Sequence, residues 1–226
     1  YKIISDYLNE SSGQNSGPSG SRLRLWLKLN THKLNLLADE KNWVECEKLA
    51  FEITEKLQNA SDSLKNTYMF EVIAAEIQIT LHKSPINLSQ LNQLYKKSLG
   101  ITSPVTHPKF MGIVYECGAK VQFYRGNYEQ ARLELYESFK NYDEAGLESK
   151  NKILKYLALC LLLTENQFDP FESQETQSYT QVDEFSKLLK LIQSYNESNL
   201  AKFQAIVNEM TDSDDPLVKD DIFIHS

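Results

Sequence analysis

The sequence has little glycine or proline, few cysteines and no long apolar run. Among 226 residues there are 8 Gly and 6 Pro, whereas Leu, Lys, Glu, Asn and Gln are abundant. Because Gly and Pro interrupt regular structure and the abundant residues favour helix, this composition favours a helical chain. The most apolar run covers Tyr156 to Leu163. It is far shorter than the roughly 20 residues that span a bilayer, so it predicts a buried helix and no membrane partner.

The three cysteines, Cys46, Cys117 and Cys160, are odd in number and far apart. Each lies in an apolar helical context, so we expect reduced thiols of an intracellular protein, packed as small hydrophobic side chains. A disulfide framework is not expected. At Tyr1 the charged region and the apolar region of a secretory signal are both missing.

Basic residues are also in deficit, since the formal net charge is −7. Nucleic-acid binders usually carry a basic excess, so no nucleic-acid partner is predicted. The four histidines have no zinc-like spacing to one another or to cysteine, and His107, just before Pro108, is interpreted as structural. The sequence contains no phosphate-binding glycine loop and no nucleophile elbow. We therefore predict no catalytic residue, no metal site and no cofactor.

Apolar residues recur at helical spacing along most of the chain, without the alternation of strands. Residues 1–8 predict a helix fragment, and residues 9–21, rich in Ser and Gly, predict a flexible linker or a gap in the sequence. Residues 22–226 predict a helical-repeat arm and the start of a further helical bundle. A polar loop is expected over Asn166–Asp183. The first expected helix begins at Arg22. The following helices are expected over Trp43–Leu57, Ser61–Leu81, Leu88–Leu99, Lys109–Tyr124, the stretch after Gly126, Lys150–Thr164, Glu184–Tyr195 and Leu200–Met210.

The first full helix carries two apolar faces. One face contains Leu23, Trp26, Leu27, Leu34 and Leu37, and a second contains Leu25, Leu29 and Leu36. A helix with two apolar faces is expected to lie between neighbours on both sides.

Charged residues at two places suggest partner binding. Arg24, Lys28 and His32 are four residues apart and form one stripe on the first full helix. The stripe is either a solvated face or a docking strip for an acidic partner. The acidic region near the end is interpreted as helix capping and solubility. It contains Asp212, Asp214, Asp215, Asp220 and Asp221.

Helix pairs resemble one another at an offset of 85 residues. "KNWVECEKLAFEI" aligns with "RGNYEQARLELYES", so that Asn42 matches Asn127 and Trp43 matches Tyr128. Such self-similarity is typical of tetratricopeptide-like repeats, whose second helix packs on its own partner and on the next unit. The residues predicted to pack the repeats are Trp43, Cys46, Gly118, Ala119, Gly126, Tyr128, Ala131 and Leu135.

Four ordered motifs identify a family. They are "ECGAK" from Glu116, "FKNYDEAG" from Phe139, "DPFESQE" from Asp169 and "DDPL" from Asp214. Together with "RLRLWLKLNTHKLNLL" they resemble the second-subunit family of the COP-nine signalosome, over about residues 22–222. The departures from the family pattern are Ala119, Ala145, Asp169 and Glu172.

The resemblance implies an all-α, tetratricopeptide-like right-handed helical-repeat solenoid leading toward a PCI module whose winged helix is absent after Ser226. It implies a non-catalytic scaffold in a complex that removes a ubiquitin-like modifier from cullins, where another, metal-dependent subunit is the isopeptidase. The implied partners are the other signalosome subunits and a cullin–RING ligase, whose cullin C-terminal region and RING protein the arm would dock. The implied localisation is cytoplasmic and nuclear.

Three alternatives remain open. The paralogous non-ATPase subunit of the proteasome lid shares the repeat, although "NYDEAG" and "DPFESQE" favour the signalosome. A free-standing repeat adaptor would bind a peptide in its concave groove. An enzyme with an unrecognised active site is the alternative with the least support.

Overall fold

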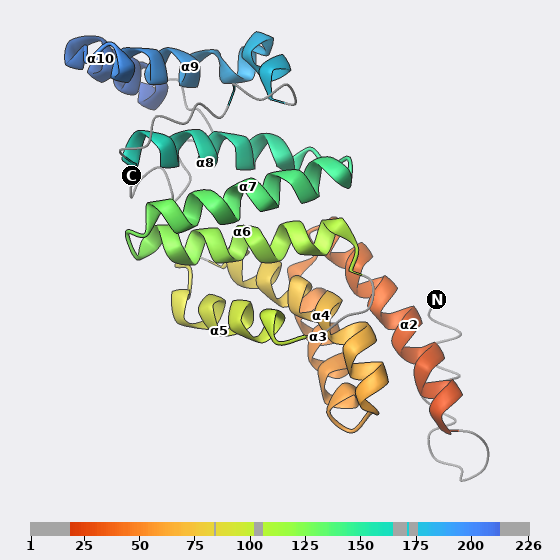
Figure 1. The fold of residues 1–226 in the computed structure, drawn as a ribbon. Coiled ribbons are helices and arrows are strands. Elements are labelled where there is room, and N and C mark those ends of the chain that lie inside the picture. Colours follow the sequence, from red (N-terminus) through yellow and green to blue (C-terminus); the bar gives the residue numbers. More distant parts are fainter. Residues whose placement is uncertain (1–18, 84, 102–105, 165–170, 172–175, 213–226) are drawn as a thin grey trace. The chain divides into compact units, whose positions relative to one another are not determined.

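The computed structural model describes residues 19–83, 85–101, 106–164, 171 and 176–212 (Figure 1). Within these ranges the regular structure is nine α-helices and one 3-10 helix, without a strand. The predicted helix fragment over residues 1–8 lies outside the described residues. The helices are α2 (Ser19–Asp39), α3 (Trp43–Gln58), α4 (Asp62–His82), α5 (Leu88–Leu99), α6 (Pro108–Tyr124), α7 (Tyr128–Glu144), α8 (Ser149–Leu163), η2 (Gln177–Gln181), α9 (Asp183–Asn196) and α10 (Leu200–Asp212).

The chain forms two compact units, residues 1–114 and 115–226. In the first unit α3 packs against α2 and α4, and α4 also contacts α2 and α5. In the second unit α8 packs against α7 and α9, and α9 packs against α10. Short turns connect most neighbours, which makes the connected helices antiparallel hairpins. The predicted class, an all-α chain of helical repeats, is confirmed.

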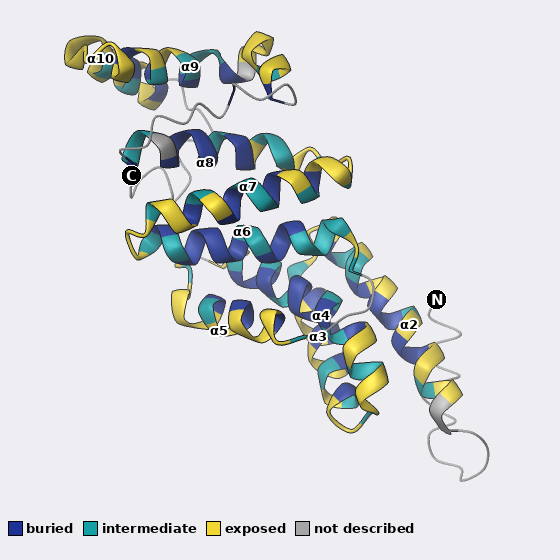
Figure 2. Cartoon of the chain, viewed as in Figure 1, coloured by how far each residue is buried: buried dark blue, intermediate teal, exposed yellow. Residues whose placement is uncertain are grey.

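One continuous core holds α2, α3 and α4 together in the first unit (Figure 2). Burying each large apolar side chain contributes about 1.5–3 kcal/mol, so this cluster is the main stabilising feature of the unit. Its most buried members come from all three helices. They are Leu27, Leu34, Cys46, Ile53, Leu57 and Val72, each 0% exposed.

The outer face of α2 differs from the prediction. Leu25 and Leu36 are 47% and 43% exposed, and Leu29 is half-buried. The prediction of neighbours on both sides of this helix is therefore wrong for the described residues, because α3 and α4 meet only the face that carries Trp26 and Leu27.

One backbone turn ends four of the described helices. A residue with positive φ follows each helix: Lys41 (φ 58), Gly126 (φ 76), Gly146 (φ 67) and Ser198 (φ 54). Its N–H donates to the carbonyl three residues back, and the next N–H donates five residues back. This Schellman arrangement satisfies carbonyls that a helix end leaves without partners. Two of these turns are 85 residues apart, so the repeat in the sequence corresponds to a repeat in backbone geometry.

Two boundaries differ from the predictions. Helix α2 begins at Ser19, so the last three residues of the predicted linker are helical. The predicted polar loop contains the 3-10 helix η2, whose Tyr179 ring lies 5.5 Å from Phe185 and 6.3 Å from Phe139. Phe171 is 5% exposed and also contacts Phe185, at 6.0 Å. These apolar contacts, which a polar composition obscures, attach the described part of the loop to the helices.

Candidate partner-binding surface

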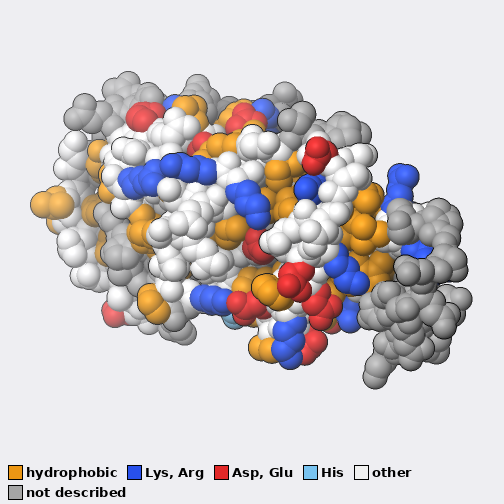
Figure 3. Space-filling view, turned by 90° about the horizontal axis from the view of Figure 1, so that it is seen from below, with side chains coloured by type: hydrophobic (Ala, Val, Ile, Leu, Met, Phe, Trp, Pro, Cys, Tyr) orange, Lys and Arg blue, Asp and Glu red, His pale blue; other side chains and the backbone are white. Residues whose placement is uncertain are grey.

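The outer face of α2 presents both cations and leucines to solvent. Arg24, Lys28 and His32 are all exposed, on the side of the helix away from the core. Seen from below, hydrophobic side chains lie beside Lys and Arg side chains on the surface of the molecule (Figure 3). The predicted stripe is thus accessible, and an exposed apolar row accompanies it.

The cations of this face are not neutralised within the described part of the chain. There, Arg22, Arg24, Lys28 and Lys33 are exposed and make no ion pair. Elsewhere in the same unit, Lys48 pairs with Glu45 at 3.2 Å and Lys83 pairs with Glu47 at 2.7 Å. The outer face of α2 is therefore locally electropositive on a chain whose net charge is −7.

In the first unit, the predicted repeat-packing residues lie at the start of α3. Trp43 packs partly buried against the core, and its ring lies 4.9 Å from that of His82. Cys46 is 0% exposed, with its Sγ 3.9 Å from the Leu34 carbonyl oxygen. Both side chains connect α3 to the helices on either side of it in the sequence.

In the second unit, the predicted residues lie on both sides of the turn at Gly126, on α6 and α7. The Tyr128 ring meets Phe123 edge-on at 5.2 Å, and Ala131 and Leu135 are 0% and 1% exposed. Gly118 is buried and Ala119 is 1% exposed. Gly126 itself is exposed, and a Cβ there would meet nothing within 4 Å, so its positive φ is what favours glycine.

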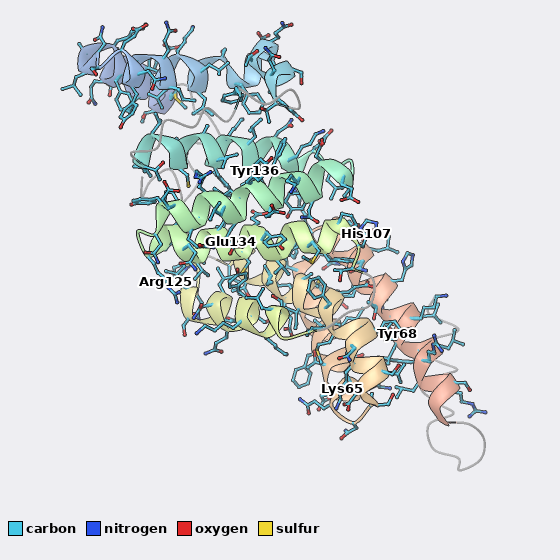
Figure 4. All side chains as sticks on the ribbon, viewed as in Figure 1. Lys65, Tyr68, His107, Arg125, Glu134 and Tyr136 are labelled. Atoms are coloured by element: carbon cyan, nitrogen blue, oxygen red, sulfur yellow. The ribbon has the colours of Figure 1, made fainter. Side chains whose placement is uncertain are left out.

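His107 lies immediately before α6 (Figure 4). Its Nδ1 accepts a hydrogen bond from the Lys109 N–H at 3.1 Å, and its ring lies 5.9 Å from Phe110. The imidazole thus accepts a hydrogen bond from one of the N–H groups that a helix start leaves without an intrahelical partner. This is the structural role that the His–Pro pair suggests.

The second unit contains a buried polar cluster that was not predicted from the sequence. Lys120 Nζ lies 3.5 Å from Glu116 Oε1, and the Tyr142 hydroxyl donates to Glu116 Oε2 at 2.9 Å. The same ammonium lies 5.6 Å from the Tyr156 ring centroid. Only 6% of the Lys120 side chain and 13% of the Glu116 side chain are exposed. The four-residue spacing within "ECGAK" was the available signal, because two opposite charges four apart share one helix face.

The three cysteines are buried and free. Desolvation by burial raises the pKa of the Cys46 thiol to about 11 and the pKa of Cys117 and of Cys160 to about 12. Among the described residues, no group of three or more His, Cys, Asp or Glu side chains is arranged to hold a metal ion. No described helix combines the length and apolar character needed to cross a membrane. Of the acidic region, only Asp212, at the end of α10, is described.

The helix pairs, their recurring turn and the exposed α2 face define an all-α helical-repeat protein with a candidate docking surface. No family model matches the chain. It is 32% identical over 212 residues to COP9 signalosome complex subunit 2 of Emericella nidulans, covering 92% of this chain and 42% of that protein. It is 34% identical over 190 residues to the protein of that name in Drosophila melanogaster, covering 82% and 42%.

A third relative, from Dictyostelium discoideum, carries the same name and is 30% identical over 201 residues, covering 87% of this chain and 44% of the relative. The resemblance read from the motifs is therefore confirmed along most of the chain, which is a relative of the second subunit of the COP9 signalosome. The chain spans less than half the length of these curated relatives.

Proposed function

We propose that this chain is part of a signalosome second subunit and acts as a non-catalytic scaffold. The observation that carries this proposal is the 30–34% identity to proteins of that name over most of the chain. Stacked helix hairpins agree with it, since helical repeats offer extended surfaces to partner proteins. Its partners are the other signalosome subunits, in the cytoplasm and the nucleus.

We further propose that the arm docks the C-terminal region of a cullin and its RING partner. The exposed stripe of Arg24, Lys28 and His32 supports this, because Arg24 and Lys28 make no ion pair within the described part of the chain, and exposed cations attract an acidic partner and speed its approach. The leucines beside the stripe add apolar area of the kind found at the centre of interfaces.

Native mass spectrometry of complexes captured on the tagged chain tests the scaffold proposal. We expect signalosome subunits and a cullin–RING ligase to be retained. Retention of proteasome lid subunits instead would identify the paralogous lid subunit. Capture of neither assembly, with a short peptide bound tightly, would identify a repeat adaptor.

An activity assay separates the scaffold from an enzyme. The purified chain alone is incubated with a cullin that carries its ubiquitin-like modifier, and we expect the conjugate to stay intact while it binds the chain. The positive control is the complete complex, which should remove the modifier under the same conditions. Cleavage by the chain alone would overturn the non-catalytic role.

A further inference from the structure

Three hydroxyl side chains around η2 share one short sequence pattern, because each stands directly before a glutamine. They are Ser173, Thr176 and Thr180 in "ESQETQSYTQ", residues 172–181. Elsewhere in the chain this pair occurs once, at Ser89. One class of Ser/Thr protein kinases selects its acceptor by a glutamine in the next position, so this segment has the sequence of a substrate for such a kinase. A short motif of this kind needs a structure that presents it.

The structure presents one of these three acceptors. Thr176 is 3% exposed, so its hydroxyl is out of reach of a kinase. Thr180 and Gln181 are both exposed on η2, and so are the following residues 182 and 183. Ser173 lies outside the described residues. Thr180 is therefore the acceptor whose hydroxyl-bearing side chain and selecting glutamine are both accessible.

The backbone at Thr180 is also easier to open than the backbone at Ser89. A kinase takes its acceptor in an extended segment, so regular structure around the acceptor must open first. η2 is five residues of 3-10 helix, whose hydrogen bonds have poorer geometry than those of an α-helix. Ser89 lies in the first turn of α5, where the Asn87 side chain accepts a hydrogen bond from the Gln90 N–H at 3.1 Å. This cap stabilises the turn, which makes Ser89 the poorer acceptor.

We propose that Thr180 is a phosphorylation site for a Ser/Thr kinase that selects glutamine in the next position, and that its phosphate releases η2 from the helices. In this reaction the γ-phosphoryl group of ATP moves to Thr180 Oγ1. The bond from phosphorus to the leaving oxygen of ADP breaks, and a new phosphorus–oxygen bond forms at Oγ1. The hydroxyl proton passes to a carboxylate of the kinase.

A kinase that selects acidic residues is the competing choice. Asp183 follows Thr180 by three residues, a spacing that acid-directed kinases use. Neither Ser173 nor Thr176 has an acidic residue at that distance, whereas all three acceptors are followed by glutamine. The feature that the segment repeats therefore favours the glutamine-directed class.

Few contacts hold η2 on the second unit. The Tyr179 ring meets Phe185 at 5.5 Å and Phe139 at 6.3 Å, and Lys150 Nζ lies 5.9 Å from its centroid. The Val182 N–H donates to the Tyr179 carbonyl at 3.1 Å and so connects η2 to the start of α9. A segment held mainly by one side chain opens at low cost.

A phosphate on Thr180 weakens this attachment in two ways. The Thr180 hydroxyl donates to the Gln177 carbonyl at 2.7 Å, and a phosphate ester has no proton there to donate. The phosphate also adds a charge of about −1.5 to −2 near exposed Asp183, and like charges repel. The ammonium of Lys150, the cation beside Tyr179, already donates to Asp143 at 2.6 Å. Lost donation and repulsion together favour an open η2.

Phosphorylation of the full chain by a purified glutamine-directed kinase tests the site. The chain is incubated with the kinase and ATP, and each phosphorylated residue is located and quantified by mass spectrometry. We expect Thr180 to take up phosphate roughly tenfold faster than Thr176 or Ser89. Gln181→Ala removes the selecting side chain and should lower the rate at Thr180 roughly tenfold. The matched control is Gln177→Ala, an exposed glutamine of the same helix, which should leave that rate within about twofold.

Each of three outcomes overturns the site: no phosphate at Thr180, faster uptake at Ser89, or equal rates for Gln181→Ala and Gln177→Ala. A parallel reaction with an acid-directed kinase tests the competing choice. Faster uptake there, lowered by Asp183→Asn but not by Gln181→Ala, would overturn the assignment to the glutamine-directed class.

Hydrogen exchange of the phosphorylated and the unmodified chain tests the release of η2. Peptides covering residues 177–185 should exchange roughly fivefold faster after phosphorylation, while peptides from α3 should be unchanged. Thr180→Val removes the hydroxyl donor without adding charge, so it should speed exchange less. Equal exchange with and without the phosphate would overturn the release. Neither test depends on the signalosome assignment, because both use this chain alone.

Discussion

At the scale of single residues, the second unit depends on a charged cluster inside its helices. Lys120 and Glu116 are nearly buried, whereas other described pairs such as Lys48–Glu45, Lys140–Glu137 and Lys202–Glu197 are exposed on both sides. Lys120→Met keeps the length of the aliphatic stem but leaves the Glu116 carboxylate buried with the Tyr142 hydroxyl alone. Because removal of one partner strands a buried charge, we expect a loss of roughly 2–4 kcal/mol in the free energy of unfolding.

Urea unfolding at neutral pH measures this loss. The control is Lys48→Met. Lys48 also forms a Lys–Glu ion pair, with Glu45, but both of its side chains are more than half exposed. An exposed pair contributes about 0–1 kcal/mol, so the control should lose little. Equal losses for the two variants would contradict a structural role of the buried pair.

A second residue-scale prediction concerns the recurring turn. Gly126→Ala places a Cβ in a left-handed conformation, at φ 76, with no neighbouring atom within 4 Å. The cost is therefore conformational alone, about 1 kcal/mol by urea unfolding. Lys41 occupies the matching position of the first unit at φ 58, so Lys41→Gly should stabilise by a similar or smaller amount. Gly100→Ala is the control, because the φ of Gly100 is −80 and alanine accepts it; a destabilisation there as large as at Gly126 would contradict the argument.

At the scale of helices, the N-terminal caps differ in strength. The Asn87 side chain accepts a hydrogen bond from the Gln90 N–H at 3.1 Å at the start of α5, whereas the Asn127 side chain makes no cap bond at the start of α7. Asn87→Ala should cost about 1 kcal/mol of stability and fray the first turn of α5. Asn127→Ala should cost less. Amide hydrogen exchange at Gln90 and at Gln130 checks both, and equal protection losses would show that the side-chain bond does not matter.

The helices themselves were predictable because their apolar spacing and their capping residues agree. Leu88–Leu99 was predicted with its observed bounds, since Asn87 precedes it and Gly100 follows it. The neighbours of α2 were not predictable, because a row of leucines does not state whether a partner helix covers it. The buried pair of Glu116 and Lys120 was also missed, since charge alone suggests a solvated position until the tertiary packing is known.

At the scale of the molecule, similarity and structure establish different things. The chain matches about 42–44% of the length of these relatives, and this similarity identifies its family. The helix hairpins and turns explain why the matched part is a repeat. Neither identifies the face that a partner meets. That choice depends on the surface, where Arg24 and Lys28 are exposed and make no ion pair with any other described residue, on a chain with a net charge of −7.

Binding to a cullin–RING ligase at varied ionic strength tests this surface. Arg24→Glu with Lys28→Glu reverses two exposed charges, so we expect at least tenfold weaker binding at low salt. The difference should shrink as the Debye length falls from about 10 Å at 0.1 M to about 3 Å at 1 M salt. Lys96→Glu with Lys190→Glu makes the same change in net charge at exposed positions on α5 and α9 and should bind as the unaltered chain does. If both double variants weaken binding equally, the partner senses net charge alone, and the stripe on α2 is a solvated face.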